Sequence, residues 1–177
     1  MLAYLFWHRP ESPERPGPYE EALVAFHRRL AGAGLPFLLG SATYRVRGAP
    51  WLPGGAGYED WYLVPGFAEL GTLNEAAVAA ALRPGHDRVA GLAAWGTGGL
   101  YAVVQGEPAW RASACTWLGK PAGVPSADFR AGLPDTPYLL QRQLTLGPTP
   151  EFCAAGALAG GAVVGREPLL APTVGAG

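Results

Sequence analysis

The stretches Leu2–His8 (LAYLFWH) and Tyr58–Val64 (YEDWYLV) decide the fold of this chain. Both are short and rich in aromatic and aliphatic residues, which is typical of β-strands. Alternate positions of a strand point to opposite sides, and in both stretches the two sides are largely apolar. A strand with one wet face would carry polar residues at every second position. The sequence therefore predicts a sheet that is covered on both faces.

The segments around these two strands predict further elements in a fixed order. Apolar residues recur at helical spacing from Tyr19 to Leu30, which predicts a helix over residues 18–32. Other patterns predict a strand over 37–47, a helix over 67–82 with a second piece over 88–95, and a strand over 100–105. Strand, helix, strand, strand, helix, strand is the βαββαβ order of a ferredoxin-like module.

The remainder of the chain resembles a degenerate second copy of this module. Trp7–Pro10 (WHRP) is followed by Tyr19–Leu23 (YEEAL), and Trp117–Pro121 (WLGKP) is followed by Phe129–Leu133 (FRAGL). In each case an aromatic strand ends at a basic residue and a proline, and a helix then begins with an aromatic residue. This similarity predicts an internal repeat.

Together these patterns predict an α+β fold with a ferredoxin-like βαββαβ module over residues 1–106. A degenerate second ferredoxin-like copy and a C-terminal tail are expected over residues 107–177. One module alone would expose more aromatic surface than a soluble monomer tolerates, so we expect antiparallel sheets packed face to face. The second sheet can come from the same chain or from another chain, and we expect a homodimer.

The order of elements and the aromatic open face of the sheet resemble the dimeric α/β-barrel superfamily. That group includes antibiotic-biosynthesis monooxygenase-like, EthD-like and stress-responsive barrel proteins, and its two-module members include chlorite dismutase-like haem proteins. The resemblance covers residues 1–106 well and residues 113–170 less well. It rests on topology and pattern, and it assigns no catalytic residue to this chain.

Composition narrows the range of functions. The formal net charge is -1 and no basic run occurs, which argues against a nucleic-acid partner. The longest uncharged run near the end, residues 152–165, is shorter than the roughly 20 residues that span a bilayer, so no membrane partner is expected. Residues 1–7 lack the basic start of a signal peptide. Cys115 and Cys153 have no metal-ligand spacing, and we interpret them as reduced thiols. We therefore expect a cytoplasmic protein. No cofactor is expected.

The strongest candidate for chemistry is a histidine–carboxylate pair. The expected strand order places the first and third strands side by side and antiparallel, so His8 should lie near Asp60. An imidazole beside a carboxylate can transfer protons, and Asp60 would be costly to bury without a partner. We therefore interpret His8 and Asp60 as candidate catalytic residues. The alternative is an ion pair that fixes strand register.

The residues around this pair predict a substrate pocket with aromatic walls. Trp7, Tyr58, Trp61 and Tyr62 are the candidate substrate-binding residues. Arg142 lies in an apolar strand, where a buried guanidinium needs an anion. It is expected either to bind a ligand carboxylate or to pair structurally.

Other polar and glycine-rich features have simpler explanations. His27 is expected on the first helix beside its apolar stripe, as a residue at the boundary of that stripe, and His86 is expected in a loop or helix cap. With only three scattered histidines, no metal site is expected. The glycines of residues 54–57 and 96–99 match no phosphate-binding motif and are expected in turns.

The sequence therefore favours a small-molecule-binding barrel protein. It would act on a lipophilic or aromatic compound held between helices and sheet, as a cofactor-independent oxygenase or an isomerase-like enzyme. The competing hypothesis is a non-catalytic structural or interaction protein whose aromatic residues only form the core. A weaker alternative is a haem-binding protein, because haem needs a single axial histidine.

Overall fold

The computed structural model describes residues 1–108 and 112–174. The described strands are β1 (Leu2–Pro10), β2 (Gly40–Arg47), β3 (Ala56–Val64), β4 (Ala93–Gly106), β5 (Ala114–Leu118), β6 (Tyr138–Arg142), β7 (Phe152–Ala155) and β8 (Ala162–Val174). The described helices are α1 (Gly17–Gly32), α2 (Phe67–Ala77), α3 (Arg83–Ala90) and α4 (Ser126–Ala131), with a short 3-10 turn at Pro53–Gly55.

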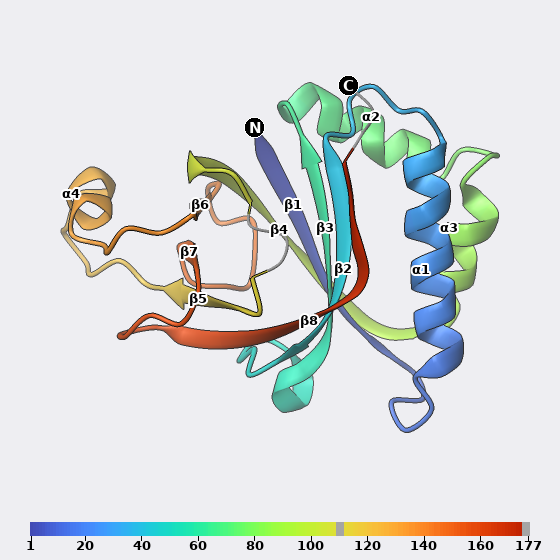
Figure 1. Ribbon diagram of the computed structural model, residues 1–177, viewed down its shortest axis with the longest axis horizontal. Helices are drawn as coiled ribbons and strands as arrows, with labels where there is room; N and C mark the ends of the chain where they lie inside the picture. The colour runs from blue at the N-terminus through green and yellow to red at the C-terminus, as the bar shows by residue number, and fades with distance from the viewer. Residues whose placement is uncertain (109–111, 175–177) are drawn as a thin grey trace.

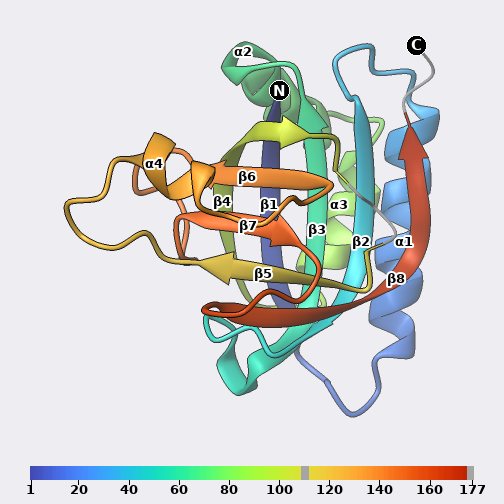
Figure 2. The same ribbon diagram turned by 60° about the vertical axis from the view of Figure 1, so that its left-hand side comes forward.

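These strands form one closed barrel, in the order β1-β3-β2-β8-β5-β7-β6-β4. Every pair of neighbours is antiparallel. Figure 1 shows α1 and α3 side by side against the outside of β1, β3 and β2, with α4 at the opposite end of the molecule. In Figure 2, β5, β6 and β7 cross in front of β1, β3 and β2 at a steep angle, so the barrel is flattened into two crossing walls.

Two seams join the walls into a single sheet. β8 pairs with β5 near its start and with β2 further along, where Glu167 lies opposite Arg45. β4 pairs with β6, where Tyr101 lies opposite Arg142. The barrel therefore closes within one chain.

This closure corrects the predicted fold class. Two ferredoxin-like modules packed face to face would keep separate sheets, whereas here hydrogen-bonded strands continue across both seams. Between β5 and β8 the chain forms only one short helix, α4, where a ferredoxin-like copy needs two. The molecule is a closed antiparallel barrel consisting mostly of strands, so the suspected membership of the dimeric α/β-barrel superfamily was wrong. The homodimer stays a prediction, and closure of the barrel does not require it.

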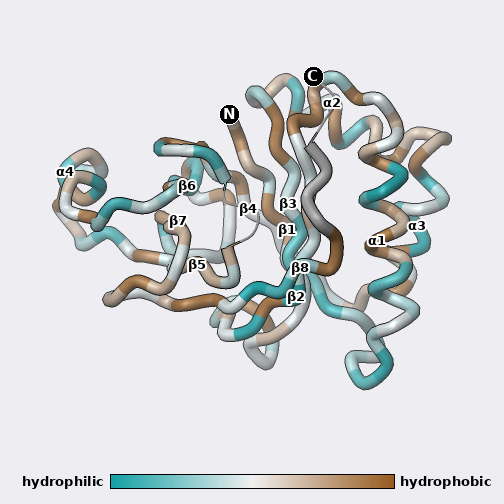
Figure 3. Tube along the Cα trace, in the orientation of Figure 1, coloured by the Kyte–Doolittle hydropathy of each residue, from teal (hydrophilic) through white to brown (hydrophobic). Residues whose placement is uncertain are grey.

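The prediction that both faces of the first and third strands are covered is confirmed. On β1, Leu5 and Trp7 point into the barrel and are 0% exposed, while His8 points to the outer face and is 1% exposed. Trp61 of β3 joins the interior cluster. Apolar and polar segments alternate along α1 in Figure 3, as expected for a helix that covers the outer face. The inner face is covered because the sheet curls onto itself.

The helix and strand boundaries of the middle segment differ from the prediction. The helix expected over 67–82 ends at Ala77, and the piece expected over 88–95 begins at Arg83 and ends at Ala90. Residues 96–99, expected as a turn, lie inside β4. A Cβ at Gly96 would lie 2.4 Å from Cζ of Phe6, so this glycine makes room for an aromatic ring lying across the strand.

Candidate acid–base site and pocket

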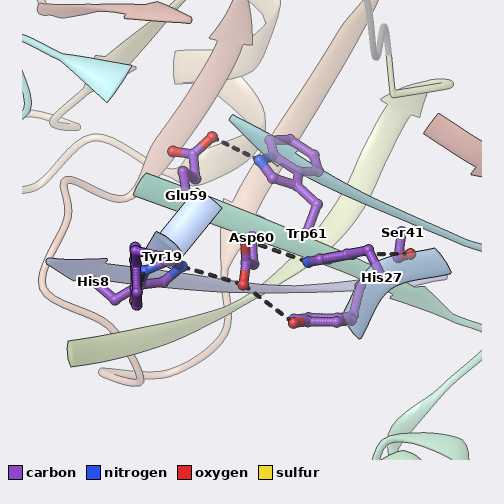
Figure 4. Close-up of polar contacts among 8 residues, drawn as sticks. His8, Tyr19, His27, Ser41, Glu59, Asp60 and Trp61 are labelled. Atoms are coloured by element: carbon purple, nitrogen blue, oxygen red, sulfur yellow. Dashed lines mark hydrogen bonds and ion pairs between the residues drawn. The ribbon is translucent and has the colours of Figure 1, made fainter. Parts of the chain in front are cut away.

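The centre of the site is Asp60, a buried carboxylate held between two histidines. Its Oδ2 lies 3.1 Å from Nε2 of His8, and its Oδ1 lies 3.4 Å from Nε2 of His27. Figure 4 shows Asp60 and both imidazoles on one side of β3, with Glu59 and Trp61 on the other side. Asp60 is 3% exposed and both histidines are 1% exposed or less. One carboxylate therefore contacts two imidazoles, and all three groups are shielded from bulk water.

Local structure explains how these side chains meet. In the β1–β3 register Phe6 lies opposite Asp60, and His8 lies one pair further along, opposite Tyr58. His8 therefore reaches Asp60 diagonally on the outer face, which is ordinary for neighbouring strands. His27 comes from α1, where Tyr19 lies eight residues, about two helical turns, before it on the same buried stripe.

Hydroxyl groups complete the arrangement at both ends. The Tyr19 hydroxyl lies 2.6 Å from Nδ1 of His8, and Ser41 Oγ lies 3.2 Å from Nδ1 of His27. An imidazole that turns its Nε2–H toward Asp60 accepts the hydroxyl proton at Nδ1. The five groups form a continuous line of polar contacts from Tyr19 through His8, Asp60 and His27 to Ser41.

The electrostatics keep the carboxylate ionised and the nearby phenols neutral. Burial alone would raise the pKa of Asp60, but the adjacent His8 and His27 outweigh it and hold that pKa well below its usual range. Burial, reinforced by the Asp60 charge, raises the pKa of Tyr19 and of Tyr62 above the ordinary tyrosine value. The Tyr62 hydroxyl donates to Asp60 Oδ2 over 3.3 Å.

A cavity of about 980 Å³ opens beside this chain of groups. It lies between the outer face of the barrel and helices α1, α2 and α3, and its size is within the range of small-molecule sites. Its lining includes three of these polar groups, Tyr19, His8 and Asp60, together with other aromatic side chains: Tyr4, Phe6, Phe26, Tyr62 and Trp95. A lipophilic compound placed there would contact the acid–base groups directly.

The structure brings together only some of the predicted site residues. His8, Asp60 and Tyr62 line the cavity. Tyr58 lies behind His8, with its ring stacked on the imidazole at 5.7 Å and its hydroxyl bonded to Glu20. It supports His8 instead of forming a wall of the cavity.

Trp7 and Trp61, also predicted as pocket walls, point into the barrel. Their indole nitrogens donate to the Glu59 carboxylate over 2.7 Å and 2.6 Å. Arg166 Nη2 lies 2.6 Å from the same carboxylate, and its guanidinium stacks on the Trp61 ring at 4.6 Å. Glu59 lies between Tyr58 and Asp60 in the strand, so its side chain must point to the opposite face from theirs, into the barrel. This alternation could have predicted the buried Glu59 cluster, but it was not used in the sequence analysis.

Arg142 lies on β6, away from the cavity. Its guanidinium donates to the backbone carbonyl oxygens of Gly147 and Thr149. Structural pairing, the second of the two alternatives weighed for Arg142, accounts for these contacts.

The positions of His27 and His86 differ from the prediction. His27, predicted beside the apolar stripe of the first helix as a boundary residue, is instead completely buried and contacts Asp60, so that prediction was wrong. The rotation of α1 about its axis decides this, and one sequence does not show it. His86, predicted in a loop or cap, lies within α3, lines the cavity and contacts Asp87 at 3.0 Å.

The described residues also bear on cofactors and membranes. Among residues 1–108 and 112–174, no group of three histidine, cysteine or acidic side chains could hold a metal ion. Both ring nitrogens of His8 and of His27 face protein groups, so neither offers a free nitrogen to haem iron. None of the described helices combines the length and the hydrophobicity that crossing a bilayer requires.

Comparisons with known proteins leave the site to be interpreted on its own geometry. No family model matches the chain, and neither a curated protein nor a solved structure matches it.

Proposed function

We propose that this protein binds a lipophilic or aromatic small molecule in the cavity between the helices and the barrel and transfers a proton on it. The observation that carries the proposal is the buried Tyr19–His8–Asp60 chain at the wall of a large, mainly apolar cavity. Burying a charge is costly, and Asp60, unlike the Glu59–Arg166 pair inside the barrel, incurs that cost at the wall of a cavity with imidazoles as its partners.

The geometry supports a specific division of roles. Tyr19 lines the cavity, and its hydroxyl touches His8 Nδ1. The Tyr19 oxygen takes a proton from the ligand while its own proton passes to Nδ1. The resulting imidazolium is stabilised by Asp60, as in other carboxylate-oriented histidine bases. Removal of a proton from carbon is the first step of isomerisation and of oxygenation without a cofactor.

The binding part of the proposal is tested by thermal unfolding with uncharged aromatic compounds such as indole, naphthalene and phenethyl alcohol. A ligand that binds only the folded state raises Tm by mass action. We expect concentration-dependent increases, which a bulky substitution in the cavity wall, Ala77→Trp, reduces. If none of the compounds raises Tm, the non-catalytic structural role is the better explanation.

The proton-transfer part is tested by exchange of the α-protons of phenylacetone in heavy water, followed by NMR. We expect the wild type to accelerate exchange, and His8→Ala and Tyr19→Phe to lower the rate by about 10²-fold or more, the usual contribution of a positioned acid or base. Arg142→Gln, far from the cavity, is the control and should retain the wild-type rate. Exchange that is equal in all four proteins would refute the catalytic role.

A further inference from the structure

The cavity carries a charge pattern that selects among ligands. Among the described residues that line it, Asp60 is the sole carboxylate, and none is lysine or arginine. The basic groups nearest Asp60 are imidazoles: His8, which lines the cavity, and His27 both contact Asp60, while His86 at the rim contacts Asp87. Asp60 is therefore the one side chain of the described lining with a permanent charge, and that charge is negative.

The surroundings of Asp60 preserve this charge. The carboxylate is 3% exposed, and its three hydroxyl neighbours in the lining, Tyr4, Tyr19 and Tyr62, are neutral. Water screens a buried charge poorly, so its field acts across the cavity. An anionic ligand would meet repulsion there, and the lining has no guanidinium or ammonium to offset it.

The aromatic rings of the cavity wall also favour a positively charged ligand. The rings of Tyr4 and Tyr62 stack at 6.0 Å, and Phe6 stacks on His8 at 5.3 Å. All four residues line the cavity. The faces of aromatic rings attract cations through their electron density.

From these two features we infer that the ligand is a lipophilic amine, protonated at neutral pH, whose ammonium group faces Asp60 and the aromatic rings. The inference rests on the proposed function and names the ligand class for the same cavity. It also predicts that the pocket rejects aromatic carboxylates of similar shape, because a ligand carboxylate would be repelled by Asp60.

Three compounds that share a phenethyl group test the inference: phenethylamine, phenethyl alcohol and hydrocinnamate. Their dissociation constants are measured with the wild-type protein by calorimetry at neutral pH. We expect the amine to bind about tenfold more tightly than the alcohol, as a desolvated cation near aromatic rings and a carboxylate should. The carboxylate should bind at least about tenfold more weakly than the alcohol.

Two variants distinguish the effect of the Asp60 charge from the effect of other negative charges on the protein. Asp60→Asn should remove most of the preference for the amine over the alcohol while the alcohol still binds. Asp87→Asn, which neutralises an exposed carboxylate beside the cavity, should leave the preference unchanged. The wild-type ranking remains decisive if Asp60→Asn does not fold.

The outcomes distinguish the two proposals. No binding by any of the three compounds would count against the cavity as a binding site, and so against the proposed function itself. Binding with the carboxylate equal to or tighter than the amine would overturn the ligand class and leave the site standing. Equal binding of amine and alcohol would overturn it in the same way.

Discussion

Asp60 is the residue on which the site depends, because its charge is expensive to bury. Two imidazoles and the Tyr62 hydroxyl compensate for the loss of water. Such a carboxylate gains its stabilisation only while it is ionised. Its role is therefore visible in the pH dependence of unfolding.

Asp60→Asn should destabilise the protein by about 1–3 kcal/mol at neutral pH, because buried donors lose their charged acceptor. The folded-state pKa of Asp60 is depressed, so its contribution is present above the unfolded value of about 4 and is lost as pH falls further. Urea unfolding of both proteins between acid and neutral pH measures this. The difference in unfolding free energy should be constant above about pH 5 and shrink below pH 4. A difference that grows on acidification would contradict this account.

Glu59 carries a second buried charge with a different task. Replacing it by glutamine leaves Arg166 in the barrel without a counter-charge, and we expect a loss of about 3–5 kcal/mol. Glu20→Gln is the matched control, since Glu20 pairs with Arg45 at the partly exposed edge of α1 and should cost less than about 1 kcal/mol. Chemical denaturation measures both values. Similar losses in the two variants would show that burial does not set the importance of these pairs.

The sequence could predict the His8–Asp60 contact because neighbouring strands of opposite direction place their ends together. It could not predict His27 or Arg166. His27 reaches Asp60 only if α1 has one particular rotation, and Arg166 reaches Glu59 only after β8 has crossed from one wall of the barrel to the other. Both conditions are set by packing between distant segments.

The alternation of side chains along β3 places the Asp60 site and the Glu59 cluster on opposite faces of the strand. Asp60 points out toward the helices, while Glu59 and Trp61 point to the other side, into the barrel (Figure 4). Tyr62 lines the same cavity as Asp60. The sequence predicted two covered faces, and it placed His8 and Asp60 correctly on one of them. It misplaced Trp7 and Trp61 because it treated both faces as walls of the same pocket.

Strand β4 was predicted too short, because its glycines also match a turn. Their reason is packing: Gly96 and Gly98 leave space over which the rings of Phe6 and Tyr4 lie. This contact exists only once β1 and β4 are paired, with His8 opposite Gly96. A local pattern of glycines therefore could not distinguish a bend from a strand beneath aromatic rings.

Gly96→Ala tests this interpretation of β4. The added Cβ would lie 2.4 Å from the Phe6 ring, so the ring must move into the cavity, and we expect a loss of about 1–3 kcal/mol together with weaker ligand binding. Gly165→Ala in β8 is the control, because its nearest neighbour would be 3.9 Å away and the strand should tolerate it. Thermal unfolding with and without phenethyl alcohol measures both effects. Equal stability of the two variants would argue against close packing at Gly96.

At the level of the molecule, closure of the barrel couples the N-terminal and C-terminal strands. The interior cluster combines Trp7 and Trp61 from the first wall with Trp117 and Val164 from the second. The seams pair β2 with β8 and β4 with β6. The two segments predicted from the sequence, 1–106 and 107–177, are therefore not expected to be stable separately.

Residues 1–106 expressed alone should fail to unfold cooperatively as a monomer. Their β2 and β4 edges would be unpaired, the barrel interior would be exposed, and Glu59 would lack Arg166. Light scattering after gel filtration and near-ultraviolet circular dichroism on heating measure this. We expect self-association or aggregation of the fragment, and recovery of a cooperative transition when residues 107–177 are co-expressed with it. A monomeric fragment with a sharp transition of its own would show that the first wall folds independently, and that closing the barrel contributes less than the buried Glu59–Arg166 contact implies.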